Sequence, residues 1–387
     1  MAAQILSATE MLEKLVAFDT TSAKTNIPLI EFVEGYLSSH GIESHRVPTE
    51  DGKKSSLHAV IGPKDVPGFG LSGHTDVVPV EGQDWTSDPF TLTKRGSRLF
   101  GRGTCDMKGF VACILSHVPA FKARDLKTPI HLLLSYDEEV GCKGVRPMIS
   151  ELGDQLPAPR AVFVGEPTSM RVVDAHKSVH AFETVVTGRE SHSSKPHLGA
   201  NAIMAAGELI SELTRIDLEM QARADGPRFD PPYTNVAVTV IDGGTARNIT
   251  ARECRFTWMF RTVPATEPEE ITDRFEAYAQ EHVLPLLRKT YDAASIVTTR
   301  TSDVPSLNAS EGSEAVSLAL KLAGQNERFA VSYGTEGGLF ERAGFPSVVI
   351  GPGSIEQAHA ADEFVEESEL EKCTAFLDRL ADHAETQ

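Results

Sequence analysis

The sequence predicts an α/β fold in which a mostly parallel, mixed sheet flanked by helices is interrupted by a separate α+β segment. Apolar, β-rich runs alternate with stretches of helical periodicity in residues 1–178 and again in residues 303–387. This alternation is typical of a parallel sheet with helical crossovers. Residues 179–302 instead show the polar–apolar alternation of an antiparallel sheet exposed on one face.

In the first segment, four apolar runs predict strands, at 57–62, 69–78, 129–137 and 161–167. Between the second and third runs, apolar residues from 107 to 121 follow helical spacing and predict a helix. The last two runs end in polar residues. Ligands of parallel sheets gather beyond the carboxyl ends of the strands, so we expect a site there.

The interrupting segment contains three alternating runs, at 181–188, 235–244 and 252–260. In the last of them Phe256, Trp258 and Phe260 share one face. Its other predicted elements are two helices, at about 200–222 and 267–290. The α/β pattern then returns with a helix at 311–324, a strand at 346–351 and a helix from about 364. We therefore expect a discontinuous domain, 1–178 with 303–387, interrupted by a domain at 179–302.

Composition excludes several classes of protein. The chain has 37 basic and 55 acidic residues and a formal charge of −18, which disfavours nucleic acid and anionic membranes as partners. No apolar run approaches the roughly 18 residues of a membrane span. Five cysteines without a CxxC pair indicate a reducing compartment, and the N-terminal segment lacks the features of a signal peptide. We expect a cytoplasmic protein.

Residues of metal-ligand type occur in five short segments at predicted strand ends or loops. The segments are GHTD (73–76), GTCDMKG (103–109), DEEVG (137–141), GEPTS (165–169) and EQAHAAD (356–362), and the candidate ligands are His74, Asp106, Glu139, Glu166 and His359. Two imidazoles and three carboxylates suit Zn²⁺ or Co²⁺, and one carboxylate is able to bridge two ions. Such a pair of ions polarises a carbonyl and activates water for hydrolysis.

Each candidate also has an ordinary structural explanation. Asp106 could be a helix N-cap, His74 a buried core histidine, and Glu139 and Glu166 solvated loop acids. Their coincidence in one predicted domain, each at the polar end of a strand or helix, favours the metal site. Cys105 suggests a thiol nucleophile, but a small packed residue explains it better. The chain has no GxSxG, P-loop or HExxH motif.

The long block from residue 73 to 109, followed by SYDEEVGCKG (135–144), resembles the M20 metallopeptidase family of dinuclear amidohydrolases. Further matching blocks are GEPTS, HSSKPHLGANAI (192–203), GGTARNIT (243–250) and GPGSIEQAH (351–359), so the resemblance runs nearly end to end. It implies a zinc-exopeptidase-like catalytic domain at 1–178 and 303–387. Residues 179–302 would form a lid and dimerisation domain, and the protein would be a homodimer.

The resemblance also implies a role for each matching residue. Asp106 would bridge two metal ions, with His74 and Glu166 at one and Glu139 and His359 at the other. Beside them, Asp76 would orient the imidazole of His74, and Glu138 would be the general base that later gives its proton to the leaving amine. A cis peptide bond would follow Asp106.

For the lid, the resemblance assigns His192 to the partner subunit's site, where it would stabilise the oxyanion. Asn248 and Arg261 match positions that bind substrate, and a guanidinium suits an α-carboxylate. Arg261 could instead solvate the polar face of its strand. GGTARNIT departs from relatives, which often have a Val-Pro type ending after the asparagine.

Among family members, the blocks around Asp106, Glu138, Glu336 and His359 most resemble the enzymes that convert N-acetyl-L-ornithine and water to L-ornithine and acetate in arginine synthesis. Glu336, in YGTEGGLF (333–340), could recognise the ornithine δ-ammonium or simply cap or solvate a loop. The alternatives are another N-acyl amino-acid hydrolase, a succinyl-diaminopimelate desuccinylase, or a catalytically silent relative that binds metal or ligand.

Overall fold

A computed structural model describes residues 5–386, which form two compact units. The first unit contains residues up to Ala175 together with Leu307–Phe329 and the chain from Thr335 onward; the second contains His176–Ser306 and Ala330–Gly334. The sequence assigned 330–334 to the first domain. The structure moves this short segment to the second unit, where the backbone N–H of Lys177 donates to the carbonyl of Val331 (3.3 Å).

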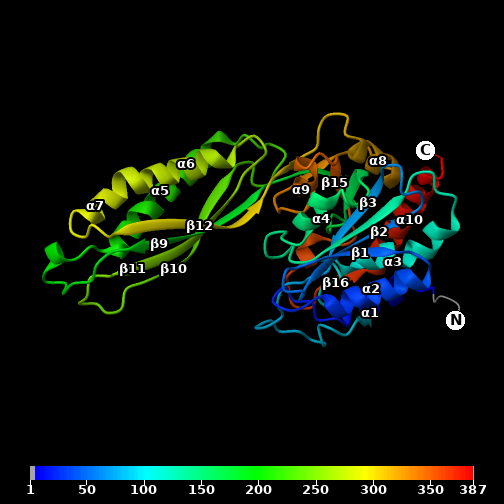
Figure 1. Ribbon diagram of the computed structural model, residues 1–387, viewed down its shortest axis with the longest axis horizontal. Coiled ribbons are helices and arrows are strands. Elements are labelled where there is room, and N and C mark those ends of the chain that lie inside the picture. The colour runs from blue at the N-terminus through cyan, green and yellow to red at the C-terminus, as the bar shows by residue number, and fades with distance from the viewer. Residues whose placement is uncertain (1–4, 387) are drawn as a thin grey trace. The chain divides into compact units, whose positions relative to one another are not determined.

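The first unit is built on a nine-stranded mixed sheet with the strand order β1-β2-β6-β3-β7-β15-β8-β13, and β14 pairs with β8 (Figure 1). The strands of this sheet are β1 (Ser44–Pro48), β2 (Ser55–Ile61), β3 (Gly68–His74), β6 (Ile130–Ser135), β7 (Pro159–Val164), β8 (Val173–His176), β13 (Leu307–Asn308), β14 (Phe329–Val331) and β15 (Ser347–Val349). The last residue of β8 and the last two of β14 are grouped with the second unit. The middle strands β6, β3, β7 and β15 are parallel, whereas β1, β2 and β8 pair antiparallel with their neighbours.

Burial explains why the middle strands are apolar along their whole length. Every residue of β3 and β6 is buried, as expected for strands covered on both faces. The flanking helices are α1 (Ala8–Val16), α2 (Ile27–Ser39), α3 (Lys108–Ala123), α4 (Val145–Glu151), α8 (Glu314–Ala323), α9 (Gly337–Arg342) and α10 (Glu367–Ala384). The main core joins α1, α2, α3, α8 and α10 to the sheet.

A small sheet, β16-β5-β4, lies in the same unit, with β4 (Thr93–Arg95), β5 (Arg98–Phe100) and β16 (Phe364–Glu366). The sequence placed the start of the final helix at about residue 364. Residues 364–366 instead pair with β5, and α10 begins at Glu367. A 3₁₀ turn, Ile355–Gln357, precedes this strand.

The second unit is a four-stranded antiparallel sheet, β10-β11-β9-β12, with helices α5 and α6 along it (Figure 1). Its elements are β9 (Val179–Thr187), a 3₁₀ turn (Pro196–Leu198), α5 (Ala202–Arg223), β10 (Asn235–Gly243), β11 (Glu253–Arg261), α6 (Pro268–Tyr278), a π-helix (Ala279–Val283), α7 (Leu284–Arg288) and β12 (Ser295–Val304). Phe256, Trp258 and Phe260 are buried on one face of β11, as their alternation predicts.

Within residues 5–386, no helix combines the length and apolar character needed to cross a membrane. The parallel strands β3, β6 and β7 end side by side, because β3 pairs in parallel with both of the others. Their carboxyl edge is therefore where the loops with candidate ligands begin.

Candidate metal centre

The candidate ligands gather at the carboxyl edge of the parallel strands. His74 is the last residue of β3, Glu138 and Glu139 follow β6, and Glu166 follows β7. Asp106 lies in the loop that leads into α3, and His359 lies in the loop before β16. Segments far apart in the sequence thus supply one cluster, all within the first unit.

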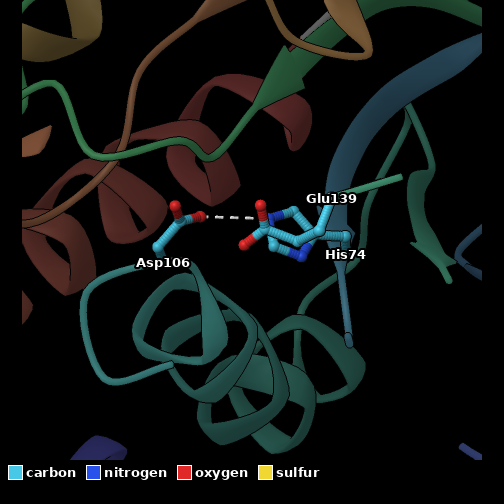
Figure 2. A group of neighbouring side chains, drawn as sticks. All are labelled: His74, Asp106 and Glu139. Atoms are coloured by element: carbon cyan, nitrogen blue, oxygen red, sulfur yellow. Dashed lines mark hydrogen bonds and ion pairs between the residues drawn. The ribbon is translucent and has the colours of Figure 1, made fainter. Parts of the chain in front are cut away.

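Asp106 lies between the two histidines, and each of its carboxylate oxygens faces one of them. Oδ1 is 3.0 Å from Nε2 of His74, a contact drawn in Figure 2, and Oδ2 is 3.2 Å from Nε2 of His359. Asp106 is only 6% exposed, so this carboxylate is held inside the cluster rather than on the surface. The structure therefore brings both predicted histidine ligands to one buried carboxylate.

Of the two remaining predicted carboxylate ligands, one lies near each histidine. Glu139 Oε2 lies 3.1 Å from Nε2 of His359, and Glu166 Oε1 lies 3.8 Å from Nε2 of His74. Potential donor atoms of His74, Asp106 and Glu139 all lie within 4.8 Å of one another, and so do those of His74, Glu138 and Glu166. The two donor groups share His74; they contain four of the five predicted ligands and Glu138, whereas His359 approaches the cluster through Asp106 and Glu139.

Asp76 supports this arrangement differently from the sequence expectation. His74 Nδ1 lies 2.9 Å from the backbone carbonyl of Asp76, whereas the carboxylate oxygen Oδ1 is 3.6 Å away. A hydrogen bond to that carbonyl leaves Nε2 as the free ring nitrogen, the one that faces the cluster. The Asp76 carboxylate instead accepts the N–H groups of Glu138 (3.1 Å) and Glu139 (3.4 Å) and the hydroxyl of Ser22 (2.7 Å).

Burial makes the acidic side chains of the cluster hard to ionise. It raises the pKa of Glu138 to about 8, against the lowering effect of His74. Burial and then repulsion from Asp106 raise the pKa of Glu139 to about 7. The pKa of Glu166 is also raised well above its usual range, chiefly by burial. Concentrated, buried negative charge of this kind is stabilised by a bound cation.

The pKa values of the two histidines are raised and that of Asp106 is lowered, because these groups pair with one another. Burial lowers the pKa of His74, but the hydrogen bond to Asp106 and the charge of Glu166 raise it well above its usual value. Hydrogen bonds to Asp106 and Glu139 raise the pKa of His359 to about 10. Burial raises the pKa of Asp106, and the hydrogen bonds from His359 and His74 outweigh it and lower the value.

The donor set fits two divalent metal ions. The predicted ligands Asp106, Glu139 and Glu166 carry a formal charge of −3 when ionised, and the neighbouring Glu138 adds a fourth negative charge, so that two divalent ions balance the cluster. Imidazole nitrogens and carboxylate oxygens are the ligands that such ions take in hydrolytic enzymes. The pairing of each Asp106 oxygen with a separate histidine provides one position on either side of this carboxylate.

Glu138 stands beside these ligands without facing a histidine at hydrogen-bond distance. The thiol of Cys142 donates to its Oε1 (3.3 Å), and its backbone is fixed by Asp76. Asp137, one residue before it, has a left-handed backbone with φ of 54°. Non-glycine residues in this region are uncommon and cluster at functional sites.

Glu336 lies beneath the cluster, not on an exposed pocket wall. It is 1% exposed, and its carboxylate accepts the hydroxyls of Ser72 (3.0 Å) and Ser135, which lie on β3 and β6. Burial raises its pKa. The sequence left two roles open for Glu336, recognition of a substrate ammonium group or a structural contact. These hydrogen bonds match the structural role, because both oxygens join two strand ends.

Cys105 has no features of a nucleophile. Its side chain is buried, its Sγ lies 3.2 Å from the carbonyl of Ser354, and burial raises the pKa of its thiol. The peptide bond between Asp106 and Met107 is cis, as the resemblance implied.

The other predicted site residues belong to the second unit. His192 and Asn248 are exposed and lie on adjoining segments, because His192 bridges to Ile249 and the N–H of Ser193 donates to the carbonyl of Asn248 (3.0 Å). His192 Nδ1 lies 2.8 Å from the hydroxyl of Ser194. Arg261 ends β11, half-buried, with Nη1 3.5 Å from the carbonyl of Ser332.

Several supporting residues had no recognisable signal in the sequence. Ser22 and Cys142 contact Asp76 and Glu138, and Ser72 and Ser135 hold Glu336. They come from different segments, so only the folded chain brings them to the site. A further supporting residue is Glu363, which accepts the backbone N–H of Asp106 (3.0 Å). It lies four residues after the candidate ligand His359, and this proximity in the sequence is a signal that could have identified it.

Comparison with known proteins places these features in context. A model of peptidase family M20/M25/M40 matches residues 70–383. Acetylornithine deacetylase from Myxococcus xanthus is 36% identical to this chain over 377 residues, covering 96% of both chains. Acetylornithine deacetylase from Proteus mirabilis (strain HI4320) is 32% identical over 382 residues, covering 97% of this chain and 96% of the relative.

Solved structures share the fold across nearly the whole chain. An M20 family metallo-carboxypeptidase from Sulfolobus solfataricus matches with a TM-score of 0.76 at 17% identity, covering 99% of this chain and all of the other. A protein from Bacillus subtilis, described as a dinuclear metal-binding peptidase of the M20 family, matches with a TM-score of 0.67 at 19% identity, covering 97% and 96%.

Proposed function

The chain belongs to peptidase family M20/M25/M40, and from this premise we propose that it is a metal-dependent amidohydrolase that cleaves N-acetyl-L-ornithine to L-ornithine and acetate. The relatives named acetylornithine deacetylase align over nearly their full length, which supports this substrate and a role in arginine synthesis. The observation that carries the proposal is the buried Asp106 carboxylate, whose two oxygens each face a histidine.

We assign the metal positions from these contacts. His74 and Glu166 would hold one ion, Glu139 and His359 the other, and Asp106 would bridge them. The mixed nitrogen and oxygen donors suit Zn²⁺ or Co²⁺. When bound, the ions polarise the acyl carbonyl and increase the acidity of water.

Glu138 is our candidate for the proton carrier. Its carboxylate is buried beside the ligands, and burial raises its pKa to about 8. A nearby cation lowers that value towards neutrality, where a group both accepts and returns protons efficiently. Glu138 would accept the proton of the attacking water and then deliver it to the leaving amine, so that ornithine departs as a neutral amine rather than an amide anion.

The second unit would supply substrate contacts, and we propose a homodimer in which His192 serves the partner's site by stabilising the oxyanion. The exposure of His192 and Asn248 on adjoining segments supports their joint use. Arg261 would bind the α-carboxylate. In this proposal 179–302 is the lid and dimerisation domain. Five buried free cysteines suit the cytoplasm.

The test is amine release from a panel of N-acyl amino acids by protein stripped of metal and reloaded with Zn²⁺ or Co²⁺. The panel contains N-acetylornithine, N-acetylmethionine, N-acetylglutamate, N-acetylcitrulline and N-succinyl-diaminopimelate. We expect metal-dependent hydrolysis with the highest kcat/KM for N-acetylornithine. A preference for another member would overturn the ornithine assignment while keeping the site, and inactivity on every member with metal bound would overturn the hydrolase proposal.

A further inference from the structure

A buried ion pair lies behind the candidate metal centre. Arg102 and Glu363 are each 1% exposed, and Nη1 of Arg102 lies 2.7 Å from Oε2 of Glu363. Removing two charges from water costs more than their mutual attraction returns unless further hydrogen bonds satisfy both partners. The remaining hydrogen bonds of Arg102 and Glu363 therefore matter, because they show which parts of the chain the pair holds in place.

Glu363 holds the backbone of the loop that ends at Asp106. Its Oε1 accepts the N–H groups of Cys105 (2.9 Å) and Asp106 (3.0 Å), and its Oε2 accepts the N–H of Gly103 (3.0 Å). One carboxylate thus fixes three amides within four residues. The direction in which the Asp106 side chain leaves its backbone is set by these contacts.

Arg102 reaches the segment on the other side, which carries His359. Its Nη1 lies 3.4 Å from the carbonyl of Ala360, and its Nη2 donates to the side-chain oxygen of Gln83. The side-chain amide of Gln83 in turn donates to the carbonyl of His359 (2.8 Å). The guanidinium also lies over the ring of Trp85, 5.1 Å from its centroid. Arg102 therefore contacts two successive backbone carbonyls, that of Ala360 directly and that of His359 through Gln83.

The two histidines of the site depend on their surroundings to different degrees. His74 lies in the fully buried strand β3, and its ring is fixed by the carbonyl of Asp76. The side chain of His359 is 53% exposed and lies in a loop, with φ of 61°. A left-handed backbone at a non-glycine residue persists only where neighbouring contacts hold it. Arg102 supplies such contacts, directly to the carbonyl of Ala360 and through Gln83 to the carbonyl of His359.

We propose that the Arg102–Glu363 pair is a positioning clamp that sets the affinity of the second metal position, formed by Glu139, His359 and Asp106, and leaves the first, formed by His74, Glu166 and Asp106, nearly unchanged. The inference rests on the proposed function, since it takes both positions to bind metal. Asp106 belongs to both positions, so the selectivity comes from His359, whose exposed loop is held by the clamp. The other ligands of the first position, His74 and Glu166, follow strands of the central sheet and do not depend on these contacts.

The test compares Zn²⁺ binding to metal-free wild type and to Glu363→Gln by isothermal titration calorimetry, with the visible absorption of bound Co²⁺ as a second readout. Gln keeps the size of the side chain but replaces one accepting oxygen by an N–H₂ group. This donor would face either the guanidinium of Arg102 or the backbone N–H groups of residues 103–106, which are donors themselves. We expect the first ion to bind within a few-fold of wild type. The second should bind on the order of 10- to 100-fold more weakly, the usual effect of losing an outer-sphere partner.

Two further variants separate positioning from general loss of stability. Arg102→Met combined with Glu363→Leu removes both charges, so that neither is left buried and unpaired, while the amides of residues 103, 105 and 106 lose their acceptor and the clamp is lost. This variant should also lose the second ion selectively. Leu380→Ala, at a fully buried position of α10, leaves a cavity in the main core and lowers stability, and it should bind both ions normally.

Wild-type affinity for both ions in Glu363→Gln and in the double variant overturns the clamp. Equal weakening of both ions, or the same selective loss in Leu380→Ala, overturns it as well. A wild-type protein that binds fewer than two ions overturns the dinuclear proposal itself, and the clamp with it. The failure of the clamp alone is therefore distinguishable from the failure of the proposed function.

Discussion

At the scale of single residues, the site is organised by how each carboxylate uses its two oxygens. Asp106 directs one oxygen to each histidine, and Asp76 directs both of its oxygens to the backbone that carries Glu138 and Glu139. Among residues 5–386, the carboxylate of Glu138 has no such structural partner except the weakly donating thiol of Cys142. A carboxylate held in place by its backbone, with its oxygens otherwise uncommitted, is suited to carry a proton.

Replacing Glu138 by Gln tests this role. Gln keeps the shape of the side chain but neither accepts nor returns a proton, so we expect kcat to fall on the order of 10²- to 10⁴-fold. Binding of two metal ions should persist, because the proposed ligands are unchanged. Activity is measured by ornithine release and metal content by elemental analysis. A variant that keeps wild-type kcat would exclude Glu138 as the proton carrier.

Glu336 provides a contrasting test. Because its oxygens accept Ser72 and Ser135 beneath the site, Glu336→Gln should leave the KM for N-acetylornithine within a few-fold of wild type. The measurement compares KM for N-acetylornithine with that for N-acetylmethionine, whose side chain is neutral. A tenfold or greater rise for the ornithine substrate alone would mean that Glu336 recognises the ammonium group after all.

At the scale of elements, the sequence was most informative where burial is continuous. The strands β3, β6 and β7 and the helix α3 were predicted because their apolar residues follow a strand or helix period. Residues 267–290, predicted as one helix, are divided into α6, a π-helix and α7. Pro285 lies in the first turn of α7, and its missing N–H and its ring prevent a regular helix through that point.

The candidate ligands could be predicted because they follow strands whose ends meet in any parallel sheet. The supporting contacts could not. The Glu363 carboxylate caps amides of residues 103–106, more than 250 positions earlier in the chain, and the Glu336 carboxylate is buried between two strands. Such contacts depend on loop geometry, which periodicity does not encode.

Strands β2 and β6 contain a titratable pair that links their stability to pH. His58 Nε2 lies 3.1 Å from His131 Nδ1 in the buried sheet. Burial lowers the pKa of His58 to about 3 and that of His131 to about 4, so both are neutral in the folded protein at pH 5. The unfolded chain takes up protons below its pKa of about 6.5, and stability is therefore lost as pH falls through this region.

We expect each of these histidines to lower the free energy of unfolding by about 1–2 kcal/mol as the pH falls from 7 to 5. The measurement is urea unfolding at both pH values for wild type and for the double variant His58→Gln, His131→Gln. The metal-site carboxylates contribute equally to both proteins, so the difference between them isolates the histidines. An equal loss in the two proteins would contradict the assignment.

At the scale of the whole molecule, we propose that His192 serves the active site of the partner subunit. This predicts complementation. His192→Ala and Glu138→Gln should each be nearly inactive, yet a mixture refolded together forms hybrid dimers in which one site has both native residues. Random pairing would restore about a quarter of wild-type activity. The control is His192→Ala mixed with itself, and the absence of any recovery in the mixture would exclude the cross-subunit role.

The central claim is that a dinuclear metal centre built around Asp106 hydrolyses N-acetyl-L-ornithine. The most direct measurement is a titration of metal-free protein with Zn²⁺, following ornithine release and metal binding on the same samples. We predict that activity is absent without metal and rises with added ion to a plateau at two ions per chain. Undiminished hydrolysis in the metal-free protein, or two bound ions without hydrolysis, would contradict this account.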